Sequence, residues 1–148
     1  MFRVHQFDKV EMYVFCLPGR SREMHEELLA HEEEIARELG LPYRVMNISV
    51  GDLGASAAKK YDIEAWFPSQ RRYREITSCS NTTDYQARRL NIRFRRDGQL
   101  EFVHTLNGTG ATARALLAIM ENFQDEGGTV AVPEVLRAYG APATLGAV

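Results

Sequence analysis

Residues 107–124, NGTGATARALLAIMENFQ, constrain the fold more than any other stretch of the chain. The Asn-Gly-Thr-Gly segment predicts a tight turn that leads directly into an amphipathic helix over Ala111–Gln124, with Arg114 near the helix start. The first backbone N–H groups of a helix are unpaired and its dipole is positive there, so helix starts bind anions. With a guanidinium beside it, this helix start predicts a site for a phosphate or carboxylate group.

Size, charge and cysteine content exclude several classes of protein. The 148 residues are enough for one domain with its own core, and the net charge of −2 shows no basic excess for a main RNA-binding surface. Cys16 and Cys79 form no CxxC or zinc-binding pattern with the four histidines, which favours a reducing, cytoplasmic setting. No apolar run approaches the roughly 20 residues that span a bilayer, so no membrane partner is expected.

Strand-like and helical patterns alternate along the chain. The predicted strands and hairpin are Val10–Leu17, Tyr43–Val50, Tyr61–Phe67, Tyr73–Ser80 and 91–105 around Asp97-Gly98. A long helix is expected from an N-cap at Ser21 to Leu39, and short helices at Thr82–Arg89 and Pro133–Tyr139. Helices that flank a largely hairpin-connected sheet predict the α+β class with a mostly antiparallel sheet.

Charged residues within these elements have two interpretations. In the first helix the acidic run Glu32–Glu34 is expected to face solvent, opposite an apolar stripe of Met24, Leu28, Ile35 and Leu39. In the strands, Glu11 and Glu75 interrupt apolar runs. A sheet with one wet face explains such residues without any function, whereas carboxylates buried there would be costly unless they met a partner or ligand. The residues alone leave both interpretations open.

Four separated stretches resemble one known family, in that family's order. They are RVHQFDKVEM at 3–12, LPYRVMNISVGDLGASAAKKYDIEAWFPSQRRYREITSCSN at 41–81, DYQARRLNIRFR at 84–95, and the stretch from Asn107 to Tyr139 that resembles motif 3. Together they are similar to bacterial-type seryl-tRNA synthetases, which are class II aminoacyl-tRNA synthetases. The resemblance implies that residues 1–140 form the C-terminal part of the catalytic domain, from the second strand of motif 2 through motif 3, and that 141–148 form a flexible tail.

The resemblance also implies a role for particular residues. Serine would be bound by Glu11, Asn107 and Thr109, and ATP by Glu75, Ile76, Thr77, Ser78 and Arg114. Arg114 would be the catalytic residue on ATP and its phosphates, and Glu75 would hold Mg²⁺ through ATP. The chain is one residue shorter than the family pattern between the NGTG segment and Arg114, which leaves the direction of that side chain open by up to ~100° around a helix of about 3.6 residues per turn.

The implied activity is that of a serine–tRNA ligase, which forms seryl-adenylate from serine and ATP and transfers the seryl group to tRNA(Ser). The family's N-terminal arm, motif 1 and the first strand of motif 2 have no counterpart in these 148 residues. The chain alone is therefore expected to be weakly active or inactive, with the family's homodimer interface largely missing. Two alternatives stay open: a paralogue that loads an amino acid onto a carrier protein, and a binding or regulatory module without catalysis.

Overall fold

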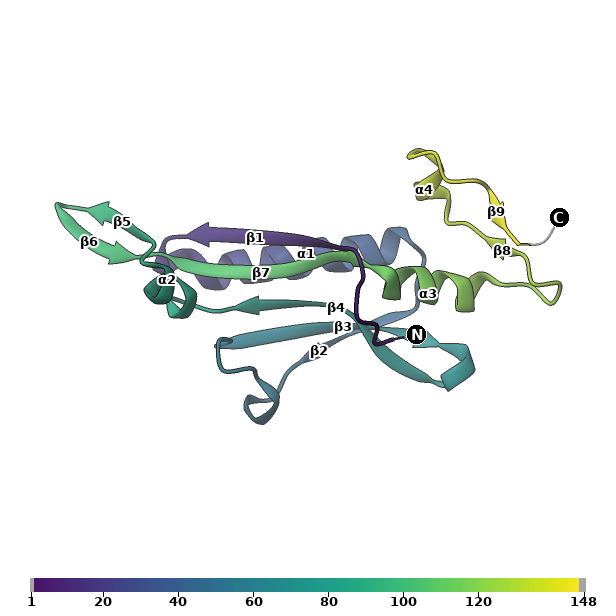
Figure 1. Ribbon diagram of the computed structural model, residues 1–148, viewed down its shortest axis with the longest axis horizontal. Helices are drawn as coiled ribbons and strands as arrows, with labels where there is room; N and C mark the ends of the chain where they lie inside the picture. The colour runs from purple at the N-terminus through teal and green to yellow at the C-terminus, as the bar shows by residue number, and fades with distance from the viewer. Residues whose placement is uncertain (1, 147–148) are drawn as a thin grey trace.

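A five-stranded antiparallel sheet with helices packed against it organises residues 2–146, the part of the chain that this computed structural model describes (Figure 1). The strand order is β1-β7-β4-β3-β2, and every neighbouring pair in it is antiparallel. The strands are β1 (Lys9–Cys16), β2 (Tyr43–Asn47), β3 (Lys59–Phe67), β4 (Arg72–Asn81) and β7 (His104–Thr112). The predicted α+β class, with a mostly antiparallel sheet and flanking helices, is confirmed.

The helices occupy different parts of this sheet. The long helix α1 (Ser21–Glu38) runs along one face and contacts mainly β7 and β4, whereas α3 (Ala113–Phe123) continues from the end of β7 and packs on β3. The short helix α2 (Tyr85–Leu90) sits beside β7, and α4 (Glu134–Arg137) lies near the C-terminus. The core forms where the second half of α1 and the apolar face of α3 meet β3.

The hairpin predicted around Asp97-Gly98 is present and projects from one end of the molecule (Figure 1). Its strands are β5 (Arg93–Arg96) and β6 (Gln99–Phe102). Asp97 and Gly98 both have positive φ angles, 48° and 84°, as the two central residues of a tight hairpin turn require. The residues of the turn were therefore sufficient to predict this hairpin.

The prediction of a turn at Asn107–Gly110 is wrong. These residues lie inside β7, and α3 begins only at Ala113, after Thr112 caps it by accepting a 3.2 Å hydrogen bond from the Arg114 amide. The two glycines do not form a turn, and instead they allow neighbouring side chains to pack closely against the backbone of β7. A Cβ at Gly108 would lie 3.0 Å from Glu32 Oε1, and one at Gly110 would lie 3.3 Å from Val10 Cγ1.

The expectation that the acidic run of α1 faces solvent is wrong for its first member. Glu32 is 1% exposed, whereas Glu34 is exposed as predicted. The helical period explains the difference, because position 32 lies four residues from both Leu28 and Ala36, which are buried on the face that meets the sheet. One carboxyl group therefore points from α1 into the interior.

The C-terminal segment folds back on itself. Within 141–148, the expected flexible tail, Thr144–Leu145 forms β9 and pairs with β8 (Val130–Ala131). Residues 147–148 of that segment lie outside the described residues. Among residues 2–146, none of the helices combines the length and apolarity that crossing a membrane requires.

The core of the sheet gives a first prediction. Phe67 at the end of β3 is fully buried, and the ring of Phe2 packs edge-on against it with centroids 4.8 Å apart. We expect Phe67→Ala to lower the free energy of unfolding by about 3–5 kcal/mol, because it removes a buried ring and leaves a cavity. Urea denaturation measures this, with Val50→Ala, at a position 86% exposed, as a control that changes stability by less than about 0.5 kcal/mol. Equal losses in the two variants would contradict the packing described.

Candidate functional site

The central feature of the site is a fork between two neighbouring strands. Among the described residues, β4 and β7 pair only at Cys79↔Gly108, Ser80↔Asn107 and Asn81↔Leu106. Beyond these pairs, toward the start of β4, each strand keeps only its outer neighbour: β4 pairs with β3 and β7 pairs with β1. The two strands therefore part on the side where α3 begins.

A cavity of about 510 Å³ lies at this fork. Its walls come from the first part of β4, the end of β7, the start of α3 and the N-terminal segment Phe2–Lys9. Six residues predicted to contact ATP or serine line it together, namely Glu75, Ile76, Thr77, Ser78, Thr109 and Arg114. Segments far apart in the sequence thus converge on one hollow of a size that suits a small ligand.

The opposite wall is formed by the N-terminal segment, which passes from β1 toward the start of β4 (Figure 1). Contacts at its first residues hold it there, since the guanidinium of Arg74 lies 4.5 Å from the centre of the Phe2 ring. Arg3, His5 and Phe7 of this segment line the cavity, and no role was predicted for them. The sequence carries no clear signal for them, because a single large apolar side chain among polar residues, such as Phe7, is common on protein surfaces.

Arg114 points into the cavity and holds β4 and α3 together. Its Nη1 donates to the backbone oxygen of Glu75 at 3.1 Å and to the carboxylate Oε2 of Glu75 at 3.2 Å. The side chains of Arg114 and Glu75 are 30% and 40% exposed, so both remain accessible from the cavity. A cation and a carboxylate therefore stand side by side at the start of α3, where the sequence predicted Arg114 to lie.

Glu11 and Asn107 lie beside the cavity without lining it. Glu11 pairs with Thr109 across β1 and β7, so the two side chains stand on one face of the sheet. Asn107 is two residues before Thr109 on the same strand and shares that face. Lys9, which does line the cavity, lies 2.6 Å from the Glu11 carboxylate. The three residues predicted to bind serine thus form one polar row that leads to the cavity.

Beneath the fork, α1 supplies the buried carboxyl of Glu32. Its Oε2 accepts a 3.0 Å hydrogen bond from the hydroxyl of Thr77, and its Oε1 has no partner among residues 2–146. Burial raises the pKa of Glu32 to about 8, although the hydrogen bond from Thr77 and the nearby Thr109 amide lower it. Glu32 is therefore largely protonated at neutral pH. The sequence analysis did not predict a role for Glu32, although its spacing of four residues from Leu28 and Ala36 placed it on the buried face of α1.

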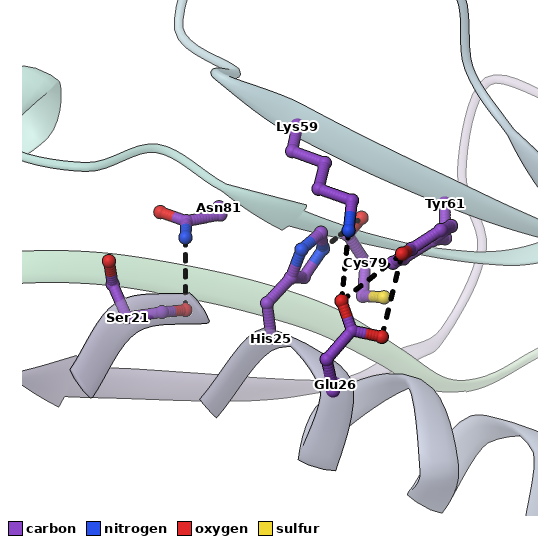
Figure 2. Close-up of polar contacts among 7 residues, drawn as sticks. All are labelled: Ser21, His25, Glu26, Lys59, Tyr61, Cys79 and Asn81. Atoms are coloured by element: carbon purple, nitrogen blue, oxygen red, sulfur yellow. Dashed lines mark hydrogen bonds and ion pairs between the residues drawn. The ribbon is translucent and has the colours of Figure 1, made fainter. Parts of the chain in front are cut away.

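A second polar contact ties α1 to β4 two turns earlier (Figure 2). His25 is buried and its Nε2 lies 3.1 Å from the carbonyl oxygen of Cys79, which can only accept, so this nitrogen donates. The imidazole stacks on Tyr61, with ring centroids 5.0 Å apart, and burial lowers the pKa of His25. The ring is therefore neutral at physiological pH and serves the packing of α1 on the sheet.

Around His25 lies a second hollow of about 1090 Å³, near the first turn of α1. Figure 2 shows the carboxylate of Glu26 at its edge, which accepts from Lys59 at 2.9 Å and from the hydroxyl of Tyr61 at 3.1 Å. This hollow is larger than the cavity at the fork, but Glu26 and Lys59 within it are paired with each other and it contains none of the predicted site residues. We therefore place the functional site at the fork.

The family of the chain follows from a match over most of its length. Residues 1–123 match the tRNA synthetase class II core domain (G, H, P, S and T). The chain belongs to this class II synthetase family. Among its relatives, the serine–tRNA ligase of Thermoplasma volcanium is 59% identical over 140 residues, covering 94% of this chain and 32% of the relative. The serine–tRNA ligase of Dictyoglomus thermophilum is 57% identical over 141 residues, covering 94% of this chain and 33% of the relative. This class II synthetase chain thus spans about a third of the length of the curated relatives it matches.

Solved structures agree with this assignment. Seryl-tRNA synthetase from Pyrococcus horikoshii complexed with ATP superposes with a TM-score of 0.96 at 54% identity, covering 99% of this chain and 34% of that one. Cytoplasmic serine-tRNA ligase from Naegleria fowleri in complex with AMP has a TM-score of 0.88 at 48% identity, covering 97% and 35%. The fork, the cavity and the start of α3 therefore belong to a class II synthetase fold.

The buried carboxyl of Glu32 predicts a specific pH dependence of stability. The folded chain retains a proton on Glu32 up to about pH 8, whereas an unfolded glutamate loses it near pH ~4.3. The charges of Glu11 on β1 and Asp62 on β3 raise this pKa further. Its contribution to stability is therefore fully present at low pH and falls as the pH rises toward 8.

Glu32→Gln removes this titration, so we expect the variant to gain stability relative to the wild type between pH 5 and pH 8. The gain is at most about 1.4 kcal/mol per pH unit, the value of one proton. Urea denaturation across this range measures it, with the exposed Glu27→Gln on the same helix as control. A constant difference between wild type and Glu32→Gln at all pH values would show that Glu32 is ionised throughout.

Proposed function

We propose that this chain is the nucleotide- and serine-binding part of a serine–tRNA ligase, which activates serine with ATP and transfers it to tRNA(Ser). The observation that carries the proposal is the cavity at the fork, where Glu75, Thr109 and Arg114 meet from three separate segments. The similarity to an ATP-complexed seryl-tRNA synthetase over 99% of the chain supports the same location for the nucleotide.

Each predicted residue has a chemical role that suits its place. ATP lies against Glu75, Ile76, Thr77 and Ser78 of β4, with its phosphates near the guanidinium of Arg114 at the start of α3. Serine lies along the polar row of Glu11, Asn107 and Thr109. A carboxylate there accepts from the serine ammonium group, and a site that pairs a hydroxyl rejects alanine, because its own polar groups would then be left without partners.

The reaction proposed for the complete enzyme is an in-line displacement at the α-phosphorus of ATP. An oxygen of the serine carboxylate forms the new P–O bond as the bond to pyrophosphate breaks, and the seryl group is then transferred from the adenylate to the terminal ribose of the tRNA. Little proton transfer is needed in the first step, so positioning and charge neutralisation supply most of the rate. Arg114, an accessible cation at the cavity, is the residue of this chain that neutralises phosphate charge.

The residues present suit a magnesium ion bound together with ATP. Mg²⁺ is usually held by one or two carboxylates and by phosphate oxygens, and Glu75 offers an accessible carboxylate in the cavity. When bound, the ion would add positive charge beside the phosphates. Glu75 then has two tasks: its backbone and one carboxylate oxygen position Arg114, and its carboxylate faces the ion.

The finer assignments follow from the same proposal. The chain corresponds to the C-terminal half of the catalytic domain of a bacterial-type, cytoplasmic enzyme, from the second strand of motif 2 through motif 3, with 141–148 as a tail. The complete enzyme is a homodimer that binds tRNA(Ser) through parts that these 148 residues do not contain. Because half of the site would come from elsewhere, we expect the chain alone to bind ATP but to activate serine poorly or not at all.

Calorimetry with ATP and Mg²⁺ tests the proposal on the chain itself. We expect binding, and a loss of affinity of about tenfold or more in Arg114→Ala, because a charge-assisted contact to phosphate is removed. Arg37→Ala, an exposed arginine on α1, is the matched control and leaves the affinity unchanged.

An absence of ATP binding, or equal losses in both arginine variants, would contradict the assignment of the site. Serine-dependent ATP–pyrophosphate exchange, measured on the same samples, should be weak or undetectable. A rate near that of an intact serine–tRNA ligase would contradict the proposal that the chain holds only part of the active site.

A further inference from the structure

Glu32 lies where β4 and β7 have no backbone pairing to hold them together. The β4–β7 ladder of the described chain stops at Cys79↔Gly108. Beyond this pair toward the cavity, Thr77 on β4 and Thr109 on β7 both line it, yet Thr77 pairs with Ile63 on β3 and Thr109 with Glu11 on β1. Neither strand therefore fixes the position of the other at the mouth of the fork.

The carboxyl of Glu32 reaches both strands from below. It accepts a 3.0 Å hydrogen bond from the Thr77 hydroxyl, and on the other side it lies against β7, where the backbone amide of Thr109 is close enough to lower its pKa. Gly108 leaves the space for it, because a Cβ there would lie 3.0 Å from Glu32 Oε1 and 3.3 Å from Cys79 Cβ. Gly108, at the last paired position, and Glu32 beneath it therefore pack closely together.

Packing alone does not account for a glutamate at this position. The side chain is 1% exposed and its Oε1 has no hydrogen-bond partner among residues 2–146, which is costly for a buried polar atom. An apolar side chain of similar volume would avoid that cost and usually leaves a core equally or more stable. What the carboxyl adds over an apolar side chain is its contact with both strands, a hydrogen bond to Thr77 on β4 and a close approach to β7 at Gly108.

Resting on the function proposed above, we propose that Glu32 is a positioning residue of the site, which fixes the spacing of Thr77 and Thr109 and thereby the width of the cleft between the nucleotide and serine sides. It touches neither substrate and acts through the two threonines. A neutral carboxyl suits this task, because its carbonyl oxygen accepts hydrogen bonds without placing a second negative charge beneath the phosphates. The raised pKa of Glu32 agrees with that neutral state.

Two variants separate this link from packing. Glu32→Gln keeps the shape and an accepting oxygen, whereas Glu32→Met keeps the approximate volume but removes both oxygens. Glu27→Gln and Glu27→Met, at an exposed position of the same helix, are the matched controls. The first readout is amide hydrogen exchange by NMR, which needs no ligand, and the second is the affinity for ATP with Mg²⁺ by calorimetry.

We expect Glu32→Met to speed exchange at the Thr109 amide about tenfold, because the polar group beside that amide and its tie to Thr77 are both removed, and to weaken ATP binding by a similar factor. Glu32→Gln should stay within about twofold of the wild type in both measurements, since it retains the acceptor. The amides of Leu106 and Asn107, in the paired part of β7, should keep their protection in all variants.

Unchanged exchange at Thr109 in Glu32→Met would overturn the proposal, and so would an equal rise at Thr109, Leu106 and Asn107, which would indicate general loosening of the sheet. If wild-type chain does not bind ATP, the proposed function fails, but the exchange data still decide whether Glu32 holds the fork. If ATP binds equally well to the wild type and to Glu32→Met while Thr109 exchange rises, Glu32 links the strands but does not position the site, and the proposal fails.

Discussion

The parting of β4 from β7 is the constraint on which the rest of the structure depends. Two strands that stay paired along their whole length leave no room for a ligand between them, whereas these two separate after Cys79↔Gly108 and open a cavity in the middle of a sheet. The outer pairings of β4 with β3 and of β7 with β1 keep each wall of the fork part of a paired sheet. Functional side chains on such walls need little ordering when a ligand binds.

Helix α1 compensates for the pairing that the fork removes. Two polar side chains on its buried face contact the sheet near the last β4–β7 pairs, His25 at the carbonyl of Cys79 and Glu32 at the hydroxyl of Thr77. On the cavity side Arg114 makes a third tie, between the start of α3 and Glu75 of β4. Polar contacts made by helices thus hold the strands where backbone hydrogen bonds cannot, and they place charge and hydroxyl groups around the opening.

Local patterns predicted the strands, the long helix and the Asp97-Gly98 hairpin, because these depend on neighbouring residues. They failed at Asn107–Gly110, where the glycines do not form a turn. Glycine is needed there because Glu32 of α1 and Val10 of β1, both far away in the sequence, pack closely against the backbone. They also failed at Glu32, where a run of three glutamates hid one that faces inward. The convergence of Glu75, Thr109 and Arg114 depends on contacts between distant segments, so only the family resemblance pointed to it from the sequence.

The most direct measurement is the mapping of NMR chemical-shift changes on the chain as ATP and Mg²⁺ are added. The account predicts that the largest changes fall on the backbone of Glu75–Ser78, on Arg114 and on the N-terminal wall at Phe7, all of which line the cavity at the fork. Changes that cluster instead around Lys59 and His25 in the second hollow, or no changes at saturating ATP, would contradict it.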